Sequence, residues 1–426
     1  MISLICIVFL VTLFLGFPVA LCLGITAAAA LIAQDIPLVL VAQRLFQGIN
    51  SFPLLAVPFF VLAGELMNRC GITQRLINFA YVLVGRVPGG LAHTNVVASM
   101  LFGGISGSAV ADAAAIGSIM VPGMIRNGYG AGFSAALTAA ASTMGPIIPP
   151  SILMVIMGVT TGMSIGGLFV AGVVPGVMLA VGMVLYSYVV AVRRKYPRDT
   201  EPMTCRRVFR EFCSAAPALM APVIILGGIL AGVFTPTEAA AVAVLYAFLL
   251  GLAYRTLHWA DVKDVLVSSG ITTAVLLLII GTANIFSWVL TSEQIPTRMA
   301  QTLLSITTNP HLILLLINIL LLFVGMFLEG GAAIIILAPT LLAVATQVGI
   351  EPLHFGMLMV LNMAVGLLTP PLGVCLFVVC GVTGLPLGRV TRAVLPFLCV
   401  EFVVLMLVTY LPALVLTLPR MFGYLQ

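Results

Sequence analysis

Long apolar runs constrain this sequence more than any other feature. The first charged side chain is Asp35, so residues 2–33 form one uninterrupted apolar segment. About 20 apolar residues suffice for a helix to cross a bilayer, and the run lacks the basic start and cleavage motif of a signal peptide. We therefore expect a retained span, bent at Gly16-Phe17-Pro18. Because barrel-type alternation of polar and apolar residues is absent, the spans should be helices.

The composition leads to the same class of protein. Apolar residues make up 62% of the chain and charged residues only 7%, whereas about a quarter of the residues in a soluble domain are charged. Such a chain has too few charges to cover a water-facing surface. We expect an all-α polytopic membrane protein whose outer faces contact the lipid bilayer.

Basic residues are concentrated in one segment near the middle of the chain. Seven of the 18 lysines and arginines lie between Arg193 and Arg210. The positive-inside rule predicts that this segment is cytoplasmic. A nucleic-acid-binding patch is the other interpretation, but it suits so hydrophobic a chain poorly, and we expect no nucleic acid partner.

Residue spacing argues against several kinds of chemistry. The only lysines are Lys195 and Lys263, and neither follows a glycine, so the chain lacks the Gly-Lys-Ser/Thr ending of a phosphate-binding loop. The eight cysteines include no Cys-x-x-Cys pair and the four histidines no His-x-x-x-His pair, so we expect no metal cluster. We find no catalytic constellation and do not expect an enzyme. Any process here that needs energy would draw it from an ion gradient or from a separate subunit.

The chain contains an internal repeat of helix-breaking residues. Two small-residue turns, Ser106-Gly107-Ser108 and Glu329-Gly330-Gly331, are each followed by a double proline, in Gly145-Pro146-Ile147-Ile148-Pro149-Pro150 and Gly366-Leu367-Leu368-Thr369-Pro370-Pro371. Five pairs, two of them within these motifs, are separated by 221 to 223 positions: Arg75 and Arg298, Gly107 and Gly330, Pro149 and Pro370, Gly158 and Gly381, and Pro175 and Pro396.

These offsets divide the chain into two structural repeats. The first covers residues 1–192 and the second residues 215–426, joined by the basic cytoplasmic linker 193–214. The sequence leaves open whether the repeats are parallel or inverted. Inverted repeats are common in secondary transporters and would relate two sites by a pseudo-two-fold axis, so we favour them.

Each repeat contains a segment with small residues at its centre. Leu91 to Pro122 and Leu312 to Pro339 are each long enough for two short helices joined by a tight turn. We interpret them as re-entrant hairpins. The alternative is one straight helix with a glycine-rich packing face.

The two proline pairs predict broken helices. Proline lacks an amide donor and disrupts the preceding turn, so each pair should free carbonyl oxygens at membrane depth, where an unsatisfied carbonyl is costly. A kink satisfied by neighbouring helices is one solution. A bound cation is the other, since hard cations prefer oxygen ligands, and we favour it because the pattern occurs twice.

The same motifs resemble a known family. The runs Phe59–Glu65, Ser106–Asp112 and Pro146–Ser151, with Thr369–Gly373 in the second half, resemble the large membrane subunit of tripartite ATP-independent periplasmic (TRAP) transporters. The resemblance implies a sodium-driven secondary transporter of the bacterial inner membrane that works by an elevator movement. It also implies a small four-helix membrane subunit, here expected as a separate chain, and a periplasmic substrate-binding protein. A passive channel, or a permease energised by a separate ATPase, is the alternative.

The resemblance also implies one sodium site in each half. The first would use Ser106 and Ser108 with carbonyls near Gly145, Ile148 and Pro150. The second would use Gly325, Gly366, Thr369 and Leu372.

A small carboxylate, such as a C4-dicarboxylate, a sugar acid, a keto acid or a sialic acid, would lie between these two sites. The candidates for its binding residues are Asn95, Asp112, Thr143, Glu329, Gly330, Gly331 and Asn362. Asp112 has a second interpretation, as the cap of the second hairpin helix. Glu65 and Glu238 are expected to have structural roles, Glu238 in an N-terminal cap.

Overall fold

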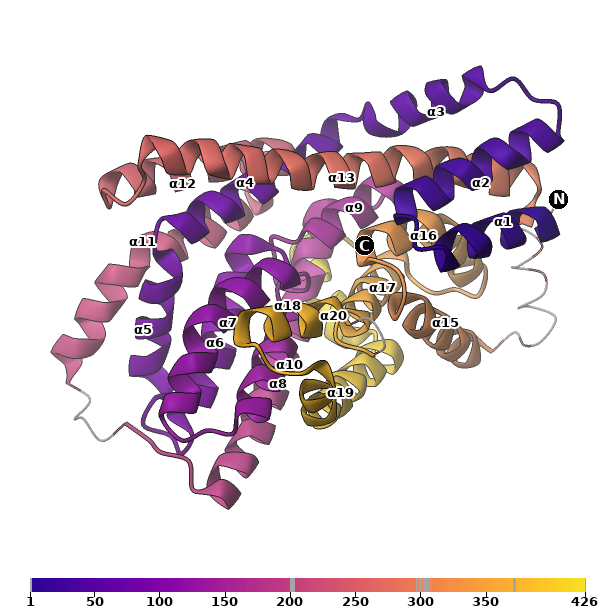
Figure 1. The fold of residues 1–426 in the computed structure, drawn as a ribbon. Coiled ribbons are helices and arrows are strands. Elements are labelled where there is room, and N and C mark those ends of the chain that lie inside the picture. Colours follow the sequence, from indigo (N-terminus) through magenta and orange to yellow (C-terminus); the bar gives the residue numbers. More distant parts are fainter. Residues whose placement is uncertain are drawn as a thin grey trace.

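The structure is a computed structural model that describes residues 2–199, 204–295, 298, 301, 307, 309–370 and 373–425. Over these ranges every regular element is a helix (Figure 1). In chain order the elements are α1 (Ile2–Phe14), α2 (Val19–Ala33), α3 (Val39–Ile49), the short 3-10 helix η1 (Phe52–Leu55), α4 (Ala56–Arg69), α5 (Ile72–Val84), α6 (Gly90–Ser106), α7 (Ala109–Arg126), α8 (Ala131–Ser142), α9 (Ile152–Thr161), α10 (Ile165–Arg194), α11 (Cys205–Leu230), α12 (Pro236–Ala253), α13 (Trp259–Ser292), α15 (Pro310–Gly325), α16 (Gly330–Gln347), α17 (Pro352–Gly366), α18 (Val374–Thr383), α19 (Leu387–Tyr410) and α20 (Ala413–Met421).

The helices confirm a polytopic membrane protein. Within the described ranges, eight helical segments are long and apolar enough to cross a bilayer. Large apolar side chains also remain exposed along the longest helices, such as Val181 and Leu185 on α10 and Ile271 and Val275 on α13. Faces of this kind are suited to lipid rather than to water.

The N-terminal apolar run differs from the single bent span expected above. It forms two separate helices, α1 and α2, which pack against each other. The break falls at residues 15–18, where Gly16 has a φ of +82° and Pro18 precedes the first residue of α2. Glycine in the left-handed conformation ends the first helix, and proline, which lacks an amide donor, is best tolerated at the start of the next. The run therefore forms two helices joined by a turn and not one bent helix.

Two groups of helices make up the molecule. In Figure 1, α12, α4 and α13 run along one side as a beam, with α11 and α5 at one end and α1 to α3 at the other. Extensive contacts join α4 to α12, and α13 to α2, α3 and α4. The remaining helices, α6 to α10 and α15 to α20, pack into a core beside this beam.

The core contains both of the hairpins expected from the sequence. α6 and α7 are joined only by Gly107 and Ser108, and they pack against each other; α15 and α16 form the second hairpin. The alternative of a single straight helix in each place is therefore wrong. Helices are interrupted between α8 and α9, where Pro149 and Pro150 lie, and between α17 and α18, where Pro370 lies.

The order of elements is the same in the two halves of the core. A hairpin, a broken helix and a long helix occur as α6 to α10 and again as α15 to α19. The inverted relation of the two halves, and the domain boundaries at residues 192 and 215, stay predictions.

Candidate functional site

The tip of the first hairpin lies against the first helix break. Gly107 ends α6 with a φ of +62°, and a Cβ atom at this glycine would lie 2.8 Å from the carbonyl oxygen of Pro150. Ser108 is the N-cap of α7, where its Oγ accepts a hydrogen bond of 3.4 Å from the amide of Ala111. Only a residue without a side chain permits this left-handed turn and this close approach. The tip is thus held directly over the break.

Asp112 lies beneath the tip with one oxygen unused. It is fully buried, and the Oγ of Ser106 donates a hydrogen bond to its Oδ1. Its Oδ2 has no hydrogen-bond partner in the described structure, and a Cβ at Gly145 would lie 2.6 Å from it. Since Ser108 is the cap of α7, Asp112 is not. Its free oxygen faces the break instead.

The first break leaves several backbone oxygens without partners. Within the described residues, no hydrogen bond reaches the carbonyl of Gly145, Ile148 or Pro150. By contrast, the carbonyl of Pro146 accepts a 2.5 Å hydrogen bond from Ser151, which also caps α9. Buried carbonyls are normally paired, so these three oxygens, expected from the sequence as cation ligands, retain the capacity to bind a cation.

Each hairpin packs against its broken helix at a point where a glycine of the hairpin contacts a glycine at the break. A Cβ at Gly103 would lie 2.9 Å from the Cα of Gly145, and a Cβ at Gly366 would lie 2.8 Å from the Cα and carbonyl oxygen of Gly325. Contacts this short leave no room for any side chain. The crossings bring Gly325 and Gly366 of the expected second ion site together.

The rest of the second site is only partly described. Thr369 lies in the break after α17, and its hydroxyl donates a 2.8 Å hydrogen bond to the carbonyl of Val365. The lone pairs of the Thr369 oxygen remain free to accept a hydrogen bond or to bind a cation. Leu372 lies outside the described residues. No group of three or more His, Cys, Asp or Glu side chains in the described ranges could hold a metal ion, so hydroxyl and carbonyl oxygens would supply most of the ligands of any cation here.

The tip of the second hairpin packs against the first half of the chain. Glu329 caps α16 by accepting a 3.1 Å hydrogen bond from the amide of Ala332. Cβ atoms at Gly330 and Gly331 would lie 3.2 Å from Leu153 and 3.1 Å from Ile156 on α9. The two glycines therefore allow α16 to approach the helix that follows the first break.

A cavity of about 430 Å³ lies where these parts meet. Its walls come from the beam helices α4 and α13, the first hairpin tip, both helix breaks and Glu329. Of the residues expected to bind ion or substrate, the cavity is lined by Ser106, Ser108 and Glu329. Glu65 also lines it, half-buried and without an ion pair in the described structure, whereas the sequence suggested a structural role. Glu238 does form the expected cap, with Thr235.

Asn95 and Asn362 lie in the core away from this cavity. The amide of Asn95 donates to the hydroxyl of Thr138 at 2.7 Å, and that of Asn362 donates to the side chain of Asn318 at 2.8 Å. Both are fully buried. These bonds join α6 to α8 and α15 to α17, so they fix each hairpin to its broken helix.

Thr143 contacts a buried acid that the sequence interpretation missed. Its hydroxyl lies 2.6 Å from Oε1 of Glu401 on α19. Glu401 is fully buried, and its Oε2 has no hydrogen-bond partner in the described structure. A single glutamate inside the apolar helix 387–410 is itself a signal of function in a membrane segment. The contact ties α19 to the last residues before the first break.

The comparisons with known proteins agree with this arrangement. Residues 6–414 match the family described as the DctM component of the tripartite ATP-independent periplasmic transporter. The chain is 45% identical over 97% of both chains to the sialic acid TRAP transporter large permease protein SiaM of Vibrio cholerae. It is 43% identical over 90% of both chains to the C4-dicarboxylate TRAP transporter large permease protein DctM of Pseudomonas aeruginosa. The YdaH transporter of Alcanivorax borkumensis has a similar fold, with a TM-score of 0.64 at 16% identity over 95% of this chain and 97% of that one.

The glycine crossing predicts a stability difference between two alanine variants. Gly366→Ala places a methyl group 2.8 Å from the backbone of Gly325, and overpacking of this kind should lower the free energy of unfolding by about 1–3 kcal/mol. Gly381→Ala in α18 meets no atom within 4 Å and should leave stability unchanged or raise it. Thermal unfolding in detergent measures both. Equal midpoints would show that the crossing is not tightly packed.

Proposed function

The chain belongs to the DctM family of TRAP transporters, and we propose that it imports a small organic acid by sodium symport. As a member of this family it is the large permease subunit, a multi-pass protein of the inner membrane and not an enzyme. The observation that carries the proposal is the central cavity, into which both hairpin tips and both helix breaks project.

The charges around the cavity support coupling to a cation. Glu65 and Glu329 line it, and no lysine or arginine does so within the described structure. An anionic substrate would therefore meet negative charge and find no basic side chain to offset it. Sodium ions at the two breaks would supply the missing positive charge, and the three unpaired carbonyls described above supply oxygens for the first of them.

The substrate class follows from the cavity and from the relatives. A volume of about 430 Å³ lies in the range typical of small-molecule sites. The first turn of α7, from Ser108 to Ala111, lines the cavity, and the positive end of a helix favours a carboxylate. Because relatives are named for sialic acid and for C4-dicarboxylates, we propose a small carboxylate for this chain.

The remaining parts of the proposal concern partners and movement. A separate small four-helix subunit would complete the membrane complex, and a periplasmic binding protein would deliver the substrate.

The cavity lies between the beam and the core, since α4 and α13 supply one wall and the hairpins and breaks the other. A core that slides along the beam would carry the cavity across the membrane, which is the elevator movement.

Uptake into proteoliposomes tests the proposal directly. The vesicles would contain this chain and its small subunit, with binding protein and labelled carboxylate outside, and an inward sodium or potassium gradient without ATP. We expect concentrative uptake only with sodium and only with the binding protein. Flux that is independent of any gradient would support a passive channel, and a requirement for ATP would support an ATPase-driven permease.

A threonine pair tests the second ion site. Thr369→Val removes one candidate ligand oxygen and should raise the sodium concentration for half-maximal uptake roughly tenfold, as expected for loss of about 1.4 kcal/mol. Thr383 makes the same hydrogen bond to a carbonyl four residues earlier, at 2.6 Å against 2.8 Å for Thr369, but lies at the end of α18. Thr383→Val is therefore the matched control and should leave the sodium titration unchanged. If both variants titrate alike, Thr369 is not a ligand.

A further inference from the structure

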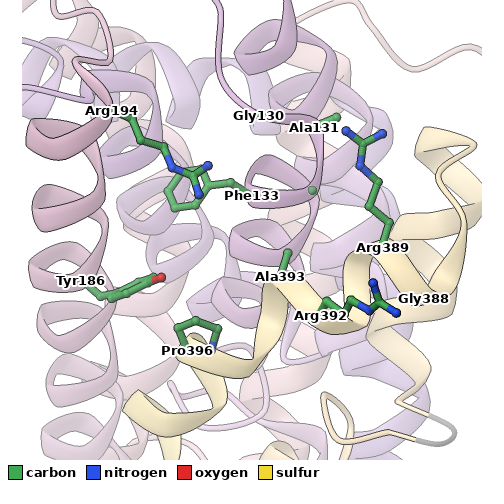
Figure 2. A pocket seen from close by; sticks show the side chains of 11 residues that line it. Gly130, Ala131, Phe133, Tyr186, Arg194, Gly388, Arg389, Arg392, Ala393 and Pro396 are labelled. Atoms are coloured by element: carbon green, nitrogen blue, oxygen red, sulfur yellow. The ribbon is translucent and has the colours of Figure 1, made fainter.

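A second cavity, of about 720 Å³, lies where one end of α10 meets the first turns of α8 and α19 (Figure 2). It shares no lining residue with the central cavity. The side chains that define its character are Arg194, Arg389, Arg392, Phe133, Tyr186 and Pro396. Figure 2 shows Arg194 on one side, Arg389 and Arg392 on the other, and Phe133 between them. We call this the arginine cavity.

The arginine cavity carries concentrated positive charge. Arg194 comes from α10, and Arg389 and Arg392 come from α19. No acidic residue lines the cavity in the described structure, and none of the three arginines forms a described salt bridge. The positive-inside rule explains arginines at helix ends. It does not explain why three exposed arginines from two helices distant in sequence border one hollow. Arg194 donates a hydrogen bond of 3.2 Å to the hydroxyl of Tyr196, and the grouped positive charge would attract an anion.

Close packing sets the position of the two walls. A Cβ at Gly132 on α8 would lie 3.5 Å from Ala393 and 3.7 Å from the side chain of Arg389, so α19 is held against the start of α8. The ring of Phe397 lies 5.8 Å from that of Phe133 and 4.8 Å from that of Tyr186. The cavity is therefore a built feature of the core and not a gap between loose loops.

An apolar surface continues from the arginine cavity along the same helices. Leu185 and Val189 on α10 are 61% and 45% exposed, and Leu395 on α19 is 53% exposed. In the sequence, Leu185 is next to Tyr186 and Leu395 is next to Pro396, and both Tyr186 and Pro396 line the cavity. A ligand that filled the cavity could thus extend an apolar tail over these exposed apolar side chains.

We propose that the arginine cavity binds the phosphate of an anionic phospholipid, such as phosphatidylglycerol. Arginine pairs with phosphate through two parallel hydrogen bonds, and basic pockets between membrane helices bind anionic headgroups. A soluble phosphate or carboxylate would use the arginines but not the exposed leucine and valine side chains. The apolar continuation therefore favours a lipid, with its acyl chains along α10 and α19.

The test measures lipid binding to the purified protein in a neutral detergent. Short-chain phosphatidylglycerol is titrated against thermal stability, and retained lipid is counted by native mass spectrometry, with phosphatidylcholine as the neutral comparison. Replacing both Arg389 and Arg392 with glutamine should weaken phosphatidylglycerol binding about 25-fold, at about fivefold per arginine.

Two controls separate charge at this cavity from charge at the helix end. Arg193→Gln removes the neighbouring exposed charge, which does not line the cavity, and should retain the affinity of the unaltered chain. Arg392→Lys keeps the charge and should bind more tightly than Arg392→Gln. The unfolding midpoint of the double variant without lipid, compared with that of these controls, shows whether its loss of binding comes from misfolding.

Three results would overturn the proposal. The first is equal binding by the unaltered chain and the double variant. The second is equal retention of phosphatidylglycerol and phosphatidylcholine. The third is stabilisation by inorganic phosphate or glycerophosphoglycerol as strong as that by the lipid, which would identify a soluble anion as the ligand.

Discussion

A backbone carbonyl freed at membrane depth needs a partner, and the core of this protein depends on how that need is met. The helix breaks between α8 and α9 and between α17 and α18 lie inside the core, where lipid offers no hydrogen bonds. The glycine crossings bring each hairpin onto a break so closely that no side chain fits between them. At the first break, three carbonyls remain without a described partner, and the unused oxygen of Asp112 faces the same region. A cation would satisfy what the packing leaves unpaired.

The sequence predicted the parts of the fold that depend on local chemistry. The turns at Ser106–Ser108 and Glu329–Gly331 and the breaks before Pro150 and Pro370 follow from residues that cannot continue a helix. The N-terminal run was predicted less well, since Gly16 to Pro18 separates two packed helices where a bend was expected. Local pattern shows that a helix is interrupted, but not which way the chain then turns.

Contacts between distant segments could not be predicted. Thr143 meets Glu401 across 258 positions, and Asn362 pairs with Asn318 instead of lining the cavity. Glu65 reaches the cavity because α4 belongs to the beam that faces the hairpins. Polarity alone marked these residues as unusual in apolar helices, and only their packing shows which of them line the cavity. The charged residues are also placed by packing: Glu65 and Glu329 line the central cavity, and arginines line the arginine cavity at the helix ends.

The central claim is that cation and carboxylate meet between the two hairpin tips. The most direct measurement is a pair of cryo-electron microscopy maps of the membrane complex with substrate, one in sodium and one in potassium. The account predicts substrate density in the cavity lined by Ser108 and Glu329, with density beside both helix breaks in the sodium map only. Substrate density elsewhere, or identical density at the breaks in both ions, would contradict it.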